Sequence, residues 1–110
     1  MNEEIKRYIE NYPAEIRDLY MKLRAIIYDS VSQKIEEKMW AKIPSYYVND
    51  SFMRFILFKD HINIEARAVV EHKDQFDGYK ITPKGMLQLY LNQEIPYDMI
   101  RQVCVDTLGR

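Results

Sequence analysis

The sequence is poor in the residues that make disulfides, flexible linkers and membrane spans. It has one cysteine, Cys104, which excludes a disulfide within the chain and a metal cluster built on cysteines. Only three glycines and four prolines in 110 residues argue against disorder and long linkers. No stretch approaches the roughly 20 apolar residues of a membrane span, and the acidic start Met-Asn-Glu-Glu is unlike a signal peptide. We therefore expect a cytoplasmic protein in which residues 1–110 form one domain.

Charge of one sign is also lacking. Lysine and arginine together number 16 against 17 acidic residues, a net charge of -1. A nucleic-acid partner requires a concentrated basic surface, so we expect neither nucleic acid nor membrane as a partner. Aromatic residues are plentiful, with nine tyrosines, four phenylalanines and one tryptophan. In a chain this small, many tyrosines must lie at the margin of the core.

The most apolar stretch reads as two strands. It predicts one strand over Phe52 to Lys59 and a second over His61 to Ala66, broken at Asp60. The first has large apolar side chains at both alternate positions, which is typical of a central strand. The second alternates apolar with polar residues, which predicts one buried face.

Helical spacing predicts helices at both ends of the chain. A short helix follows the N-cap residue Asn2, and an amphipathic helix is expected over Pro13 to Val31. A final helix begins near Pro96, with Gly109 placed as a C-cap glycine. Packing both terminal helices on one face is the simplest way to bury their apolar stripes.

The remaining strands complete the predicted fold. A strand over Glu37 to Ile43 is interrupted by Pro44 and resumes over Ser45 to Val48, which suggests an edge strand, a bulge or a bend. A short helix is expected over Arg67 to Phe76 and a strand over Met86 to Leu91. The fold class we predict is α+β, a two-layer sandwich of an antiparallel β-sheet with the N-terminal and C-terminal helices on one face.

A set of landmarks occurs in a familiar order along the chain. They are Tyr8-Ile9 before Pro13; Glu36-Glu37 before Trp40 and Ile43-Pro44; Phe58-Lys59-Asp60-His61-Ile62; Tyr79-Lys80 before Pro83-Lys84-Gly85; and Ile95-Pro96. Together they resemble the YdhG-like family of small bacterial proteins, a domain of unknown function. The resemblance implies a compact α+β fold and a role, proposed for some members, as a frataxin-like iron chaperone.

One departure from that family lies at Ala41. The family commonly has an aromatic-Gly-Met-Pro stretch, whereas this chain reads Trp40-Ala41-Lys42-Ile43-Pro44. A ligand contact that needs close backbone approach at the glycine is therefore in doubt. For the weak iron binding that the resemblance implies, we assign Glu36 and Glu37 as the metal carboxylates. Hard oxygen ligands suit iron delivery, but here acidic residues are mixed with lysines and arginines.

Two alternatives stand beside iron. The first is a ligand pocket that holds a small anion through two lysines and a histidine; its predicted residues are Trp40, Tyr46, Lys59, His61 and Lys84. The second is a protein-interaction or homodimer module that uses an exposed strand edge at residues 46–48, so the protein is a monomer or a homodimer. No acid–base pair or nucleophile motif is visible, so we expect no enzyme and no catalytic residue.

Several of these residues also have plain structural readings. Lys59 and His61 can form a polar hairpin corner, and Lys84 can lie in a β-turn over residues 82–85. Glu15 and Asp18 share one helix face, as a solvated surface or as a cation site.

Overall fold

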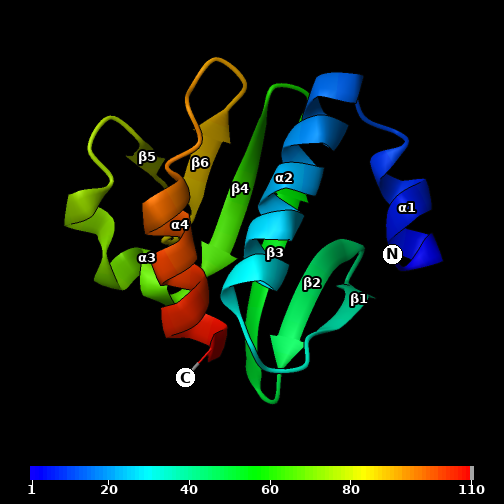
Figure 1. Ribbon diagram of the computed structural model, residues 1–110. Helices are drawn as coiled ribbons and strands as arrows, with labels where there is room; N and C mark the ends of the chain where they lie inside the picture. The colour runs from blue at the N-terminus through cyan, green and yellow to red at the C-terminus, as the bar shows by residue number, and fades with distance from the viewer. Residues whose placement is uncertain (110) are drawn as a thin grey trace.

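The structure, a computed structural model, describes residues 1–109 as helices packed on a sheet (Figure 1). The helices are α1 (Glu3–Ile9), α2 (Ala14–Ser30), α3 (Arg67–Glu71) and α4 (Tyr97–Cys104). The strands are β1 (Glu36–Trp40), β2 (Ile43–Val48), β3 (Ser51–Leu57), β4 (His61–Ala66), β5 (Lys80–Ile81) and β6 (Leu87–Tyr90). A 3₁₀ turn (Lys73–Gln75) follows α3. None of the helices within residues 1–109 is both long and apolar enough to cross a lipid bilayer.

The sheet is antiparallel at every pairing, with strand order β1-β2-β3-β4-β6-β5. The predicted central strand is confirmed, because β3 lies inside the sheet. The edge predicted at residues 46–48 is wrong, because β2 lies between β1 and β3. Pro44 is tolerated there: it pairs with Met39 of β1 and precedes the β3 pairing, which begins at Ser45.

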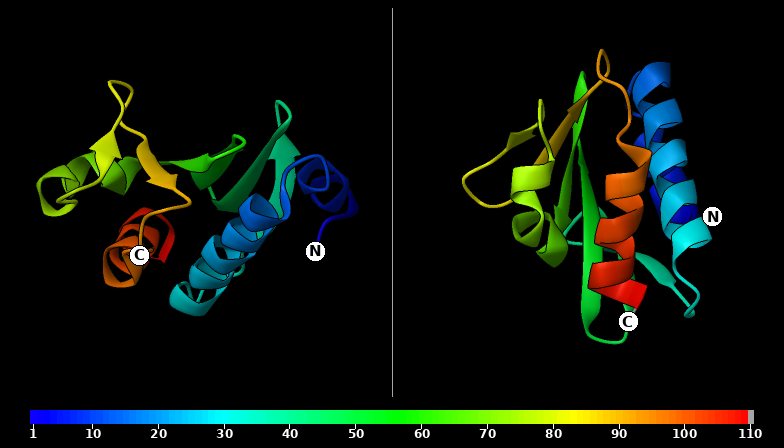
Figure 2. Two further views of the ribbon diagram at one scale, coloured as in Figure 1. Left: turned by 90° about the horizontal axis from the view of Figure 1, so that it is seen from above. Right: turned by 60° about the vertical axis from the view of Figure 1, so that its left-hand side comes forward.

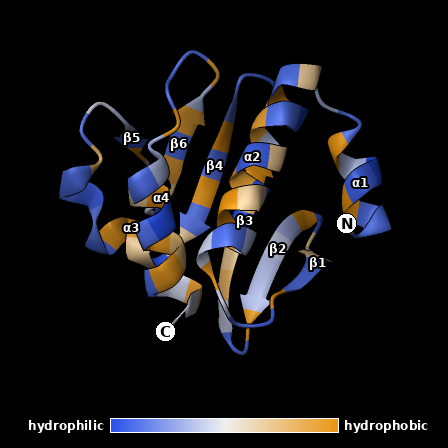
Figure 3. Ribbon diagram, in the orientation of Figure 1, coloured by the Kyte–Doolittle hydropathy of each residue, from blue (hydrophilic) through white to orange (hydrophobic). Residues whose placement is uncertain are grey.

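Helices α2 and α4 lie over the same face of the sheet, which confirms the predicted two-layer α+β arrangement (Figure 2). Apolar and polar segments alternate along α2 (Figure 3), because only one side of the helix meets the sheet. That side includes Ile16, Leu23 and Ile27, all fully buried. Met53 and Phe55 of β3 belong to the same core, and the Phe55 ring lies 5.7 Å from the ring of Tyr20 on α2. Full burial of one such side chain contributes roughly 1.5–3 kcal/mol, so this contact holds the two layers together.

The helix starts follow the expected capping chemistry. The Asn2 side chain accepts hydrogen bonds from the amides of Glu4 (2.8 Å) and Ile5 (3.2 Å), which satisfies the free N–H groups of α1. Pro13 immediately precedes α2, where its fixed φ is compatible with a helix start. At the other end of the chain, Gly109 closes a π-helical turn (Val105–Gly109) after α4, and it does not adopt the expected left-handed cap.

The chain turns sharply between β1 and β2, which the sequence did not predict. Ala41 and Lys42 have φ values of 48° and 66°, so both are left-handed and form a two-residue hairpin turn. The continuous strand predicted over Glu37 to Ile43 is therefore wrong. Turns of this kind favour asparagine and glycine, and neither residue is present at the two positions.

Candidate functional site

The face of the sheet opposite α2 and α4 is covered by none of the helices within residues 1–109, and we call it the open face (Figure 2). Side chains alternate along a strand, so residues between the buried positions of β3 and β4 point to it. The open face comprises Glu36, Lys38, Trp40, Ile43, Ser45, Tyr47, Phe52, Arg54, Ile56, Phe58, His61, Asn63, Glu65, Gln88 and Tyr90.

Arg54 is the most unusual residue of the open face. Its guanidinium carbon lies 3.9 Å from the centre of the Trp40 ring and 3.7 Å from the centre of the Phe52 ring. An arginine stacked between two aromatic faces is held by cation–π attraction, worth about 2 kcal/mol when desolvated. The Arg54 side chain is only 8% exposed, although it lies on the side of the sheet without helices.

Hydrogen bonds fix the plane of the guanidinium. Its Nε donates to Ser45 Oγ at 3.1 Å, and its Nη2 donates to the Tyr47 hydroxyl at 3.0 Å. Ser45 is small enough for the long side chain to cross β2 toward Trp40. The nearest carboxylate to Nη1 is that of Glu65, at 3.8 Å. At that distance the pair is an ion pair without a good hydrogen bond, which leaves the Nη1 donors for a better acceptor.

A second aromatic cluster occupies the far end of β3 and β4. The His61 ring is stacked on Phe58 at 4.4 Å and on Tyr90 at 4.5 Å between ring centres. The Asp60 carboxylate lies 2.7 Å from His61 Nδ1 and orients the imidazole. Phe58 donates its amide to the His61 carbonyl at 2.9 Å, which closes the hairpin. The hairpin expected at this stretch is present, but the His61 ring lies in an aromatic stack and not in a polar corner.

Two carboxamides lie between these clusters. Asn63 of β4 is directly opposite Gln88 of β6, and both point to the open face. Within residues 1–109, neither Asn63 Oδ1 nor Gln88 Oε1 has a hydrogen-bond partner, although both oxygens are buried. Such an unsatisfied group costs about 1–3 kcal/mol, so the pair weakens the fold.

Tyr46, predicted to line a ligand pocket, instead lies on the helix side of the sheet. It is fully buried, and its hydroxyl meets the Tyr20 hydroxyl of α2 and the Glu37 carboxylate of β1. Burial, together with the hydroxyl of Tyr20 and the charge of Glu37, raises the pKa of Tyr46 far above its ordinary value. Tyr46 is therefore part of the core and is separated by the sheet from Trp40 and His61.

Glu36 and Glu37, predicted as a metal pair, point to opposite faces. Glu36 is exposed and lies 3.4 Å from the Lys38 ammonium. Glu37 is 8% exposed and accepts two hydrogen bonds from Arg24, at 2.6 and 3.2 Å. Burial opposes ionisation of Glu37, but hydrogen bonds from Arg24, Tyr46 and the Asn2 amide outweigh it and lower its pKa. The two carboxylates therefore do not share one ion.

The two predicted lysines lie in turns. Lys59 is in the β3–β4 turn beside the histidine stack, and Lys84 is in the β5–β6 turn. In the latter turn Gly85 donates to Thr82 at 2.8 Å, which confirms the predicted β-turn. Gly85 has φ +87°, and a Cβ there would lie 2.7 Å from Val70.

Of the five residues predicted to form one pocket, only Trp40 and His61 point to the open face.

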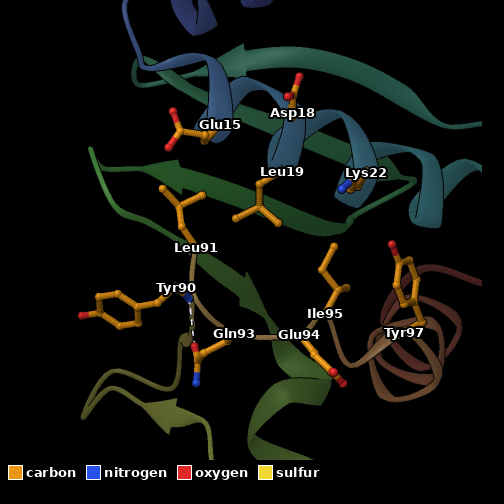
Figure 4. Close-up of a pocket in the computed structure, with 10 residues that line it drawn as sticks. All are labelled: Glu15, Asp18, Leu19, Lys22, Tyr90, Leu91, Gln93, Glu94, Ile95 and Tyr97. Atoms are coloured by element: carbon orange, nitrogen blue, oxygen red, sulfur yellow. Dashed lines mark hydrogen bonds between the residues drawn. The ribbon is translucent and has the colours of Figure 1, made fainter.

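A groove of about 610 Å³ lies on the helix side, between α2 and the β6–α4 connection (Figure 4). Leu19, Leu91 and Ile95 point into it. The carboxylates of Glu15 and Asp18 point outward from α2, so they do not converge on a common point. No group of three His, Cys, Asp or Glu side chains within residues 1–109 is placed to hold a metal. The solvated-face reading of Glu15 and Asp18 fits this geometry.

Fold and site together define an α+β two-layer protein with an aromatic, partly polar open sheet face. Comparison with protein-family models, with curated proteins and with solved structures finds no match to this chain.

Three polar residues at the centre of the open face, Arg54, Asn63 and Gln88, are absent from the site predicted from the sequence. A signal for two of them was present. Arg54 is the one charged residue inside the apolar run from Phe52 to Phe58, and Asn63 lies between two buried isoleucines of β4. A polar residue at such a position in a central strand is either satisfied by neighbours or reserved for a ligand.

Proposed function

We propose that this protein binds, without transforming it, a small anionic molecule on the open face, with Arg54 as the group that holds the anion. The observation that carries the proposal is the state of the Arg54 side chain. It is stacked between two rings and oriented by two hydrogen bonds, while its Nη1 lies 3.8 Å from the nearest carboxylate. A planar guanidinium with free donors suits a carboxylate or a phosphate.

The surroundings of Arg54 support the same ligand class. Lys38 lies on the same face, with its ammonium 4.8 Å from the centre of the Tyr47 ring and 3.4 Å from the Glu36 carboxylate, so a bound anion would share this charge with Glu36. The Trp40 side chain is half exposed and offers an apolar surface beside the charge. Holding Arg54 in place before the ligand arrives reduces the entropy lost on binding.

The single tryptophan makes the proposal directly testable. Because Trp40 stacks on Arg54, its fluorescence reports an anion that reaches the guanidinium. We expect a saturable change on titration with citrate or inorganic phosphate. Arg54→Lys keeps the charge but loses the planar fork, and should weaken binding about ten-fold. The matched control is Arg101→Lys, on the exposed face of α4, which should bind as the unsubstituted protein does.

Equal anion binding by Arg54→Lys would overturn the proposal. Circular dichroism of each variant separates lost binding from lost folding. If Arg54→Lys does not fold, Tyr47→Phe serves instead, because it removes the hydroxyl that accepts from Nη2 and orients the guanidinium. We expect Tyr47→Phe to weaken anion binding by a few-fold.

Iron binding, which the family resemblance implies, is the alternative proposal and has its own test. Glu36 is exposed on β1, and its only ion-pair partner within residues 1–109 is Lys38. Anaerobic calorimetry with Fe(II), with Mg(II) as the control ion, should give saturable heat that Glu36→Gln reduces. The Glu37→Gln change is unsuited to this test, because Glu37 supports the buried network around Arg24. No heat beyond the Mg(II) control would remove iron from consideration.

A further inference from the structure

The carboxamide oxygens of Asn63 and Gln88, at the centre of the open face, have no hydrogen-bond partner in the described part of the chain. Asn63 is 8% exposed, and within residues 1–109 both side-chain oxygens are buried without a hydrogen bond. Buried polar atoms in folded proteins almost always have partners. Two neighbouring exceptions, directly opposite one another on adjacent strands, point to a group that the free protein lacks.

The neighbours of the pair are flat and apolar. Pairing between strands places Ile56, Asn63 and Gln88 in one row across β3, β4 and β6. The next row along the strands holds the Phe58–His61–Tyr90 stack. A flat ring that lies on Ile56 would therefore have an aromatic wall on one side and the Asn63 carboxamide at its edge, with the longer Gln88 side chain reaching in from the next strand.

The chemistry of a carboxamide defines the edge that it pairs with. Each carboxamide has an N–H donor beside a C=O acceptor, and a half-turn of its terminal bond exchanges the two. A ring edge that carries neighbouring N–H and C=O groups can satisfy both Asn63 and Gln88. Nucleobases have such edges, and proteins read flat bases by hydrogen bonds combined with stacking on aromatic side chains.

We infer that the open face binds a nucleoside monophosphate, with its base edge on Asn63 and Gln88 and its phosphate toward Arg54. This inference rests on the proposed anion site at Arg54 and adds the identity of the rest of the ligand. Arg54 is opposite Glu65, two residues from Asn63 on β4, so the two contact points lie on neighbouring rows of one face. A single nucleotide, unlike a long nucleic acid, does not require a strongly basic protein, and this chain carries a net charge of -1.

Calorimetry with three probes tests the inference: uridine 5′-monophosphate, uridine and ribose 5-phosphate. We expect the nucleotide to bind about ten-fold more tightly than ribose 5-phosphate. Asn63→Leu keeps the side-chain shape and should abolish that preference, leaving nucleotide and sugar phosphate equal. The same change should leave the melting temperature of the free protein unchanged or raised, because it removes an unsatisfied polar group. The control is Asn92→Leu, at an exposed position in the β6–α4 connection, which should keep the preference.

The probes separate this inference from the proposed function. Equal binding of nucleotide and ribose 5-phosphate by the unsubstituted protein overturns the inference and leaves the anion site standing. Binding of uridine that depends on Asn63, with no binding of ribose 5-phosphate, overturns the anion site and supports the base contact. Binding of none of the probes overturns the inference, and the citrate and phosphate titrations then decide the anion site alone. Gln88→Met repeats the test if Asn63→Leu does not fold.

Discussion

Replacing Tyr46 with phenylalanine should destabilise the protein through a chain of hydrogen bonds. The Tyr46 hydroxyl lies between the Tyr20 hydroxyl and the Glu37 carboxylate. A carboxylate only accepts, so Tyr46 donates to Glu37 and in turn accepts the hydrogen of Tyr20. Tyr20 and Tyr46 are both fully buried, which excludes water as a substitute partner. Tyr46→Phe therefore removes a donor from Glu37 and leaves the Tyr20 hydroxyl unpaired.

The size of the effect follows from these two losses. A hydrogen bond to a charged group is worth about 1.5–3 kcal/mol, and an unsatisfied buried hydroxyl costs about 1–3 kcal/mol. We expect Tyr46→Phe to lower the free energy of unfolding by about 3–5 kcal/mol. Tyr20→Phe alone removes one neutral bond and should cost about 1 kcal/mol. In the double variant no hydroxyl is left unpaired, and Glu37 keeps Arg24 and the Asn2 amide. Its loss should be smaller than the sum of the single losses.

Urea denaturation of the four proteins measures this double-mutant cycle. Single and double losses that add to within about 0.5 kcal/mol would refute the hydrogen-bond chain. A Tyr46→Phe loss below about 1 kcal/mol would refute the claim that Tyr20 is left unpaired. Because Tyr46 faces the helices, Tyr46→Phe should bind citrate as tightly as the unsubstituted protein wherever it is folded.

Three other changes test separate parts of the structure. Ala41→Gly should raise the free energy of unfolding by about 0.5–1 kcal/mol, because glycine adopts the φ of 48° without strain. The urea midpoint should rise accordingly, and a lower midpoint would contradict this turn. The hydrogen bond to Asp106, 2.6 Å away, raises the pKa of His72 above 6.5. This bond adds stability that is complete below pH 6.5 and is lost as pH rises through the higher pKa of folded His72. In His72→Gln, the free energy of unfolding should therefore fall less over this pH range than in the unsubstituted protein. Burial raises the pKa of Cys104 to about 12, so a thiol reagent at about pH 8 should label it only in urea, and rapid native labelling would contradict its burial.

The layers of the fold were predictable because they follow from side-chain periodicity. Asn2 and Pro13 marked the helix starts, and the spacing of Ile16, Leu23 and Ile27 specified the buried side of α2. The alternation along β4 likewise specified its buried face, with Ile62 and Ile64 in the core. Each of these signals is local, and burying all of them together leaves few arrangements other than a sheet with helices on one face.

The turn at Ala41 was not predictable because its backbone contradicts local preference. Alanine and lysine rarely adopt left-handed φ values, so nothing in the stretch signals a hairpin. The pairing of β1 with β2 imposes the turn, with Trp40 in register with Ile43. Ala41 places a Cβ on a left-handed backbone where a glycine would be free of strain, so this turn is strained but still forms.

The predicted pocket failed for a different reason. Tyr46 and Trp40 were both assigned to the pocket because the sequence does not show which face of the sheet a side chain is on. That face depends on the register of the strands. A change of one position moves a side chain to the opposite face, which separates Glu36 from Glu37 and Tyr46 from Tyr47. An error of one position leaves the predicted fold class unchanged, but it moves a predicted site residue to the wrong face of the sheet.

Two buried polar side chains on opposite faces of this sheet differ in whether they have hydrogen-bond partners. On the helix side, Glu37 is buried with partners for its charge: Arg24, Tyr46 and the Asn2 amide. On the open face, Asn63 is also buried, but its side-chain oxygen has no hydrogen-bond partner within residues 1–109. Folding stability alone favours leucine at position 63, because an apolar side chain of the same shape carries no desolvation cost. A ligand that bonds to the carboxamide reverses that preference, so the cost of Asn63 in the free protein is itself an argument for binding at the open face.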